Sequence, residues 1–323
     1  MQLGVMVEGQ EGLGWDLWRR LFHAAEDLGF ESLWRSDHYF SFGDDRTLDA
    51  LEPFISMAVL AAETKRIRFG PLVSSVTFRH PSMVARMAAQ IDQLSGGRMV
   101  FGMGAGWNVA EHEAFGLALP AAGERLDRLA EAIQVARALW ADGPASFSGR
   151  HFTLTDAECY PKPAQRPLPV LVGGNGERRT LRIVAEHANE WNGIGLDVVA
   201  YRAKREVLHR HCEAVGRDPA TIAHSLMLGY VIGRDDRELA ERYAHLARTI
   251  PMLAGGEPDA AAGLATLRAR GWLVGGPGEI VEALGRLTEA GLGRVMLHHL
   301  AMDDFAALEL LASEVLPQAQ DPG

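Results

Sequence analysis

Cysteine is scarce in this chain: only Cys159 and Cys212 occur among its 323 residues. Two cysteines are too few for a disulfide framework, so we expect reduced thiols and a cytoplasmic protein. The sequence also contains neither a CxxC pair nor an HExxH motif. Because these spacings commonly bind zinc, the sequence predicts no metal site.

Long apolar runs are missing as well. No run approaches the roughly 20 residues that a membrane-spanning helix needs, and the first residues, MQLGVMVEG, lack the basic segment of a signal peptide. The net charge of -10 argues against nucleic acid as the main partner. No low-complexity tract or linker divides the chain, so we expect one domain over residues 1–323, with neither a membrane nor a nucleic acid as partner.

Short apolar runs alternate with amphipathic stretches along the whole chain. The runs that predict strands are 3–7, 31–34, 67–73, 99–103, 169–172, 190–194, 224–232 and 294–298. Eight strand–helix units in roughly 300 residues predict an α/β fold, a single (β/α)8 TIM barrel. A doubly wound open sheet is the alternative. Residues 249–275 have an irregular pattern and are expected to form an insertion.

Candidate functional residues follow the predicted strands, and in a parallel α/β protein these loops share one face. His38 comes just after the second strand, where it could donate a hydrogen bond or carry a proton near neutral pH. A structural role is the alternative. The neighbouring Asp37 is expected either to orient His38 or to cap the loop. In Glu111-His112-Glu113, adjacent helical side chains point in different directions, so this segment is not expected to bind a metal.

Glycine-rich segments follow the fourth and fifth strands. The segment 102–106, Gly-Met-Gly-Ala-Gly, lacks the third glycine of a dinucleotide-binding motif. Its glycines either narrow a barrel strand or let a ligand come close, and Trp107-Asn108 directly after them favours the ligand. The loop 173–176, Gly-Gly-Asn-Gly, lies before a helix whose amino end could bind an anion, with Arg178 and Arg179 nearby. A plain turn is the alternative.

Several longer motifs occur in a characteristic order: LGFESLWRSDH at 28–38, RIRFGPLVSSVTFRHP at 66–81, DQLSGGRMVFGMGAGWN at 92–108 and PVLVGGNGERRTLRIVAEHANEWN at 169–192. With them the chain resembles the luciferase-like monooxygenase superfamily, and within it the coenzyme F420 (deazaflavin)-dependent oxidoreductases. The resemblance covers nearly the whole chain. It is more specific for the superfamily than for the cofactor.

The resemblance implies a barrel with an insertion and a planar tricyclic cofactor at its carboxyl-terminal face. It places a cis peptide bond between Leu72 and Val73, under the cofactor ring. His38 matches the histidine near the reacting edge of the ring, a proton donor or substrate ligand. Glu111 resembles an acidic residue found near this site in some members, and we carry both over as catalytic candidates.

The resemblance also assigns two cofactor-binding loops. Gly106, Trp107 and Asn108 match the loop that lines the cofactor. The second loop matches one that binds the phosphate of the cofactor tail, and its residues are Gly173, Gly174, Asn175 and Gly176. An oligoglutamate tail would favour a basic mouth, for which the sequence offers Arg35, Arg46, Lys162, Arg166, Arg178 and Arg179.

The implied activity is hydride transfer between coenzyme F420 and a small organic substrate, with alcohols, sugar phosphates, enones and imines all open. The alternative is a reduced-FMN-dependent monooxygenase. A flavin or F420 reductase would then supply the cofactor. A barrel that binds a flavin-like ligand without catalysis is a third interpretation, which the combination of His38, Asn108 and the glycine-rich loop disfavours. Related proteins are commonly homodimers, so we expect a homodimer. Residues 249–275 are expected to form a lid over the substrate, or a dimer contact.

Overall fold

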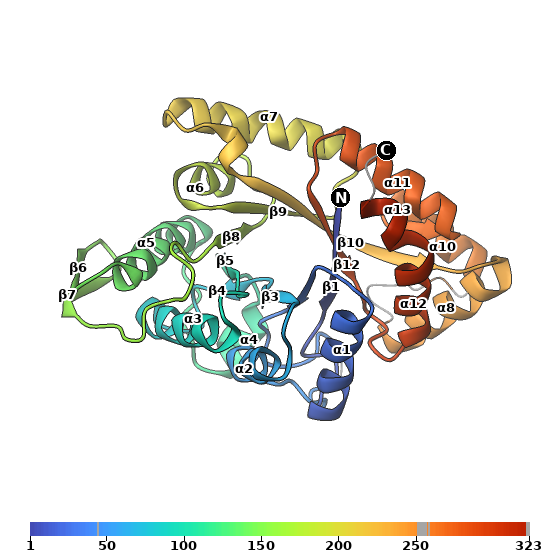
Figure 1. Cartoon of the computed structure of the whole chain (residues 1–323), viewed down its shortest axis with the longest axis horizontal. Coiled ribbons are helices and arrows are strands. Elements are labelled where there is room, and N and C mark those ends of the chain that lie inside the picture. Colours follow the sequence, from blue (N-terminus) through green and yellow to red (C-terminus); the bar gives the residue numbers. More distant parts are fainter. Residues whose placement is uncertain (44, 251–256, 258, 321–323) are drawn as a thin grey trace.

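Parallel strands and helices alternate along the computed structural model of the chain, which describes residues 1–43, 45–250, 257 and 259–320. Within these residues, nine parallel strands lie side by side in the order β3-β2-β1-β12-β10-β9-β8-β5-β4 (Figure 1). Their bounds are β1 (Gln2–Val7), β2 (Ser32–Arg35), β3 (Arg68–Pro71), β4 (Ser74–Ser75), β5 (Phe101–Gly104), β8 (Val170–Gly173), β9 (Glu190–Ile194), β10 (Ala223–Ile232) and β12 (Arg294–His298).

The sheet closes into a barrel where β3 and β4 meet β5. The N–H of Phe69 donates to the Arg98 carbonyl (3.2 Å), and the N–H of Val100 donates to the Phe69 carbonyl (2.8 Å). Farther along, β4 pairs with the end of β5. β3 and β4 thus occupy one strand position, interrupted at Leu72 and Val73, and the barrel has eight positions. The predicted (β/α)8 barrel is confirmed, and the open-sheet alternative is wrong.

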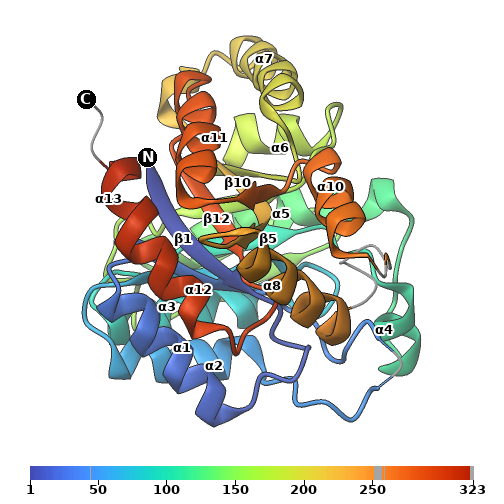
Figure 2. The ribbon, with the colours of Figure 1, turned by 90° about the vertical axis from the view of Figure 1, so that its right-hand side faces the viewer.

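Helices cover the outside of the barrel (Figures 1 and 2). They are α1 (Trp15–Asp27), α2 (Pro53–Glu63), α3 (Pro81–Ser95), α4 (Val109–Ala114), α5 (Ala122–Trp140), α6 (Thr180–His187), α7 (Val198–Ala214), α8 (Asp236–Thr249), α10 (Ala260–Ala269), α11 (Pro277–Glu289), α12 (Phe305–Leu310) and α13 (Leu316–Gln320). A π-helical turn at 311–315 joins the last two, and a 3-10 turn at 219–221 precedes β10. Within the described chain, none of these helices has the length and apolar character needed to cross a bilayer.

Helix α3 illustrates how local sequence sets an element. Pro81 occupies its first turn, where a missing N–H is harmless, and His80 caps it by accepting from the N–H of Ser82 (3.3 Å). At the other end, Gly96 takes the left-handed conformation that stops a helix (φ 67°). Buried alanines and aliphatic residues face the barrel.

The stretch 249–275 is an insertion, but it is not irregular throughout. It contains α10 and the short strand β11 (Leu273–Gly275), which extends the sheet by pairing in parallel with β10. Residues 251–256 and 258, which belong to the predicted lid or dimer contact, lie outside the described residues. A separate antiparallel hairpin is formed by β6 (Ala145–Ser148) and β7 (Thr153–Ala157).

The core has three parts, of which one lies beside α8 and α10, and the other two concern the barrel itself. The larger lies between the strands and the surrounding helices. The smaller fills the barrel interior and contains Met6, Trp34, Leu72, Val100, Leu171 and Met296. This inner layer ends at the carboxyl ends of the strands, where the side chains no longer fill the barrel and a cavity begins.

Candidate active site

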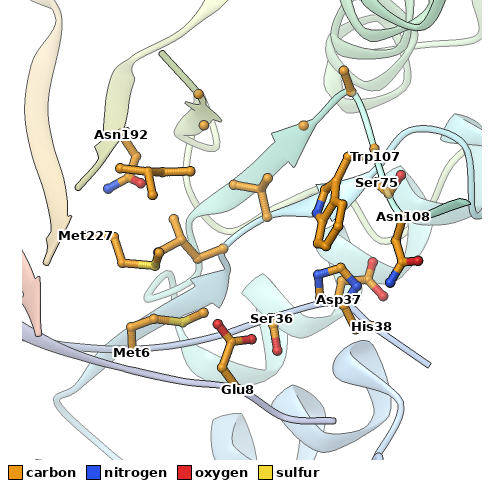
Figure 3. A pocket seen from close by; sticks show the side chains of 18 of the residues that line it. Met6, Glu8, Ser36, Asp37, His38, Ser75, Trp107, Asn108, Asn192 and Met227 are labelled. Atoms are coloured by element: carbon orange, nitrogen blue, oxygen red, sulfur yellow. The ribbon is translucent and has the colours of Figure 1, made fainter. Parts of the chain in front are cut away.

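A cavity of about 410 Å³ opens at the carboxyl ends of the strands (Figure 3). Residues at the ends of β1, β2, β5, β8 and β9, and at the break between β3 and β4, line it, and Met227 of β10 adds a side chain. Figure 3 shows His38, Trp107 and Asn108 on one side and Met227 and Asn192 on the other. This is the face on which the sequence predicts the site, and the volume suits a small-molecule ligand.

His38 and Glu111 form the central polar pair. Nδ1 of His38 lies 2.8 Å from Oε2 of Glu111, a carboxylate that is completely buried. The other oxygen, Oε1, accepts the N–H of Tyr39 (2.5 Å). With both oxygens engaged, the carboxylate fixes the imidazole and favours the tautomer that carries its proton on Nδ1. Among the described residues, Nε2 of His38 has no partner, so it is free to exchange a proton in the cavity.

The short helix α4 positions Glu111. Asn108 caps this helix, and its side-chain oxygen accepts the N–H of Glu111 (3.3 Å). His112 extends the anchor, since its ring binds the Asn108 carbonyl (2.6 Å) and the Thr77 hydroxyl (2.7 Å). Asn108 therefore both lines the cavity and sets the direction of Glu111.

The environment of His38 favours its protonated form. Burial lowers the pKa of the imidazole, but the hydrogen bond and the charge of Glu111, with smaller contributions from Glu8 and Asp37, outweigh burial and raise it above 6.5. A histidine in this state can donate a proton near neutral pH and can accept one at higher pH.

Asp37 neither orients His38 nor caps its own loop. Its carboxylate binds the Arg79 guanidinium through two contacts (2.7 and 3.1 Å) and accepts the Ser74 hydroxyl (2.9 Å). Arg79 also binds Glu52 (2.8 Å). Asp37 therefore ties the end of β2 to β4, while the orienting role belongs to Glu111.

Glu8 lines the cavity and was not predicted from the sequence. It follows β1, so the same strand-end argument that found His38 would have found it. Its carboxylate binds Nε2 of His298 (2.7 Å) and the Gln10 amide (2.9 Å). Burial raises the pKa of Glu8, but the contacts with His298, with Gln10 and the charge of His38, outweigh it and lower the pKa to about 2. The cavity thus contains a permanently ionised carboxylate.

Asn192 supplies an unused acceptor on the opposite wall. Its amide nitrogen donates to the Ser225 hydroxyl (3.0 Å) and lies 3.3 Å from the Met296 sulfur. Its oxygen is buried without a hydrogen-bond partner within the described chain. An unpaired buried acceptor is unfavourable, so its presence in a cavity wall points to a ligand that donates to it.

The peptide bond between Leu72 and Val73 is cis, as the resemblance implied, and both residues line the cavity. Gly104 and Gly173 make room for the Val73 side chain: a Cβ at Gly104 would lie 2.4 Å from a Val73 methyl, and one at Gly173 would lie 3.1 Å away. In the same way, Gly106 faces the hydroxyl of Ser75. These glycines therefore make room for neighbouring protein groups. Gly104 and Gly106 also line the cavity, so direct ligand approach along 102–106 stays a prediction.

The loop 173–176 reaches the cavity only in part. Gly173 and Gly174 line it, together with Thr180 at the start of α6. Asn175 instead binds β9, donating to the Ile194 carbonyl (2.8 Å) and accepting the Ile194 N–H (3.0 Å). Among the described residues, several peptide N–H groups at this turn donate no hydrogen bond, those of Asn175, Gly176, Glu177 and Arg178. Such a group of free donors at a helix start can bind an anion.

The predicted basic mouth is not assembled. Arg35 is fully buried and binds Ser56, while Lys162 is buried against backbone carbonyls. Arg166 pairs with Asp142, and Arg179 pairs with Asp127.

The three tryptophans near strand ends differ in role, since Trp107 lines the cavity whereas Trp34 and Trp191 are buried.

A barrel with a cavity at the carboxyl ends of its strands is the arrangement in which TIM-barrel enzymes carry their active sites. A family model described as luciferase-like monooxygenase matches residues 1–294. F420-dependent hydroxymycolic acid dehydrogenase of Mycobacterium tuberculosis is 30% identical over 311 residues, 91% of this chain and 82% of that protein. F420-dependent glucose-6-phosphate dehydrogenase of Kineococcus radiotolerans is 28% identical over 308 residues, 91% of this chain and 90% of that protein.

A solved F420-dependent secondary alcohol dehydrogenase, in complex with an F420–acetone adduct, has the same fold. It superimposes with a TM-score of 0.82 at 21% identity, and the match covers 99% of each chain. The chain belongs to the luciferase-like monooxygenase family. It is an oxidoreductase of the luciferase-like class.

Proposed function

We propose that this enzyme transfers a hydride between coenzyme F420 and a small organic substrate. The observation that carries the proposal is the His38–Glu111 pair, with Nδ1 held at 2.8 Å from a fully buried carboxylate and Nε2 left open to the cavity. Hydride transfer to or from a carbon–oxygen group needs a proton donor or acceptor beside it, and this pair supplies one. The F420-dependent relatives support the same choice.

The cavity fits a deazaflavin. Leu72, Val73 and Met227 offer apolar surface for a flat ring system. The unpaired oxygen of Asn192 is a buried acceptor that an N–H on the polar edge of such a ring would satisfy. The free peptide N–H groups after Gly174 suit the phosphate of its tail. Trp107 and Asn108 would close the side next to His38.

Bound F420 would supply the hydride acceptor or donor. The chain would supply orientation and the proton. In the reducing direction, His38 would donate from Nε2 to the substrate oxygen, and the raised pKa favours the protonated form that this needs. In the oxidising direction, neutral His38 would accept the hydroxyl proton, while Glu111 stabilises the imidazolium that forms.

A reduced-FMN-dependent monooxygenase is the second candidate, because the matching family model is described as a luciferase-like monooxygenase. Equilibrium titration of the purified protein with F420 and with FMN separates the two. We expect F420 to bind with a Kd of about 1 μM or tighter, and FMN to bind at least about tenfold more weakly. Preference for FMN would contradict the proposal and would direct attention to oxygen uptake and a flavin reductase. If F420 is preferred, an F420 reductase would supply the reduced cofactor.

We also propose a cytoplasmic homodimer. Both cysteines are free and buried, which suits a reducing compartment. An apolar groove between α2 and α3 supports the dimer: Ile55 and Leu94 line it and are 60% and 54% exposed. Sedimentation equilibrium should give a dimer for the native protein and a monomer for Leu94→Glu. A monomeric native protein would contradict the proposed homodimer but not the proposed activity.

A further inference from the structure

Among the described residues, neither a lysine nor an arginine lines the cavity. Among the residues that line it, the ionisable ones are Glu8, Asp37 and His38. The undescribed positions, 44, 251–256, 258 and 321–323, contain no lysine or arginine in the sequence. Every lysine and arginine of the chain therefore lies in the described part, and none of them lines the cavity.

Apart from His38, the ionisable side chains that face the cavity are two carboxylates, of which Glu8 lies 2.7 Å from Nε2 of His298. Asp37 is already paired with Arg79, so its charge is compensated within the protein. Glu8 is ionised, with a pKa of about 2, and in Figure 3 its carboxylate points into the space between the two walls. A phosphorylated or carboxylated substrate would have to lose its water beside this carboxylate with no lysine or arginine to pair with, which is strongly unfavourable.

Apolar and aromatic side chains make up the rest of the walls. Phe42 contacts both His38 and Trp107, with the Phe42 and Trp107 rings 5.4 Å apart, and Phe78 also lines the cavity. Ile194, at the end of β9, adds an aliphatic side chain to the lining. Trp107, which lines the cavity, is 62% exposed, and the next helix, α4, begins with the exposed Val109 (55%) and is followed by the exposed Phe115 (57%). Such a surface binds hydrocarbon rather than sugar hydroxyls.

Two of the polar side chains that face the open space can act as acceptors. The Glu8 carboxylate accepts only, and neutral His38 accepts at Nε2 because Nδ1 is engaged by Glu111. A hydroxyl group, which donates, complements them better than a carbonyl or an imine does.

We propose that the substrate is an uncharged alcohol with a hydrocarbon body, not a sugar phosphate. This inference rests on the proposed function. Oxidation breaks the carbinol C–H bond, with the hydride passing to F420, and the O–H bond, with the proton passing to Nε2 of His38, and it leaves a carbonyl compound. The hydrocarbon body lies against Phe42 and Ile194 and extends toward the aromatic mouth.

The test compares substrates on the enzyme loaded with F420. Reduction of F420 is followed with 2-propanol, 2-butanol, 2-hexanol, 2-octanol, glucose and glucose 6-phosphate. We expect kcat/KM to rise along the alkanol series and to exceed that for glucose 6-phosphate by at least about 100-fold. Calorimetry with 2-octanone should show binding to the same loaded protein, and glucose 6-phosphate should show none.

A charge-placement variant sharpens this test. Ile194→Lys puts a cation in the cavity wall, and we expect it to raise the KM for 2-octanol by at least about tenfold. Val199→Lys is the matched control: Val199 is 77% exposed on α7, outside the cavity, so its KM should equal that of the native enzyme. Equal effects of the two variants would overturn the assignment of this wall to the substrate.

The outcomes separate this inference from the proposed function. If F420 binds and glucose 6-phosphate is oxidised as well as the alkanols, the substrate class is wrong while the function stands. The same holds if F420 binds and no alkanol is oxidised. If F420 does not bind, the proposed function fails, and the inference falls with it.

Discussion

The two ends of the barrel both bury charged side chains, but they treat them differently. At the amino ends of the strands, Arg294 lies 2.6 Å from Glu190 and 2.9 Å from Glu31, and its Nη2 donates to Gln2 (3.2 Å). Burial lowers the pKa of Arg294, but the two carboxylates outweigh it and raise the pKa. Positive and negative charges here complete one another within the protein.

At the carboxyl ends, pairing is left incomplete. His38 is anchored to Glu111 through one nitrogen and presents the other to the cavity, and the oxygen of Asn192 has no partner within the described chain. Incomplete pairing lowers the stability of a folded protein unless a ligand completes it. The comparison therefore assigns stability to the base of the barrel and chemistry to its mouth, in accord with the general division of labour in this fold.

Breaking the base should produce the largest loss of stability. Arg294→Met leaves Glu190 and Glu31 without their shared cation, and we expect the free energy of unfolding to fall by about 3–5 kcal/mol. Urea denaturation measures it. Arg182→Met is the control, since Arg182 pairs with Glu186 on the exposed face of α6 and should change stability little. An equally small loss for Arg294→Met would contradict the structural role of the base.

Replacing His38 at the mouth of the barrel should strongly reduce turnover without this loss of stability. His38→Gln retains a side-chain N–H for Glu111 but cannot exchange a proton, so we expect kcat to fall by about 10²–10⁴-fold. His38→Ala should lose as much. Affinity for F420 should change little in either variant, as fluorescence titration would measure. Native turnover in both variants would remove His38 from the mechanism.

Altering Glu111 should shift the pH dependence more than it alters the rate. In Glu111→Gln the charge that raises the pKa of His38 is gone, so burial prevails and the pKa falls. Alcohol oxidation needs neutral His38, so the acid limb of kcat/KM should lie above the ordinary pKa in the native enzyme and move to lower pH in the variant. Profiles from about pH 5 to 9 measure this shift. Glu113→Gln, an exposed neighbour on α4, should leave the limb in place.

Much of this comparison could be predicted from the sequence, because strand ends share one face in a parallel barrel. That rule is enough to place His38, Trp107 and Gly173 on the same face. It would also have placed Glu8, but the loop after the first strand, residues 8–12, has neither a histidine nor a run of glycines to attract attention. The ion pairs at the base of the barrel could not be predicted either. Arg294 and its partners are far apart in sequence, and only the register of the strands brings them together.

Side-chain direction is the information that the sequence lacks. Composition alone suggested six basic residues for a mouth, yet Arg35 and Lys162 point into the core and Arg179 binds Asp127. Likewise, the glycines at 104 and 173 accommodate Val73, which no local pattern reveals. Roles that follow from position along a strand were predicted, whereas roles that follow from a contact between distant residues were not.

The smallest expected effect comes from Asn192. Its amide nitrogen is paired within the protein, like the groups at the base of the barrel, whereas its oxygen has no partner within the described chain. Asn192→Leu removes an acceptor that has no partner within the described chain, so the free energy of unfolding should change by no more than about 1 kcal/mol. The same change should weaken F420 binding about tenfold, the equivalent of one lost hydrogen bond. Ser225→Ala is the control, because it removes the hydroxyl that accepts from the Asn192 amide and leaves the unpaired oxygen in place. Unchanged affinity in Asn192→Leu would mean that this oxygen does not bind the cofactor. A large loss of stability would mean that Asn192 belongs with the paired groups at the base of the barrel.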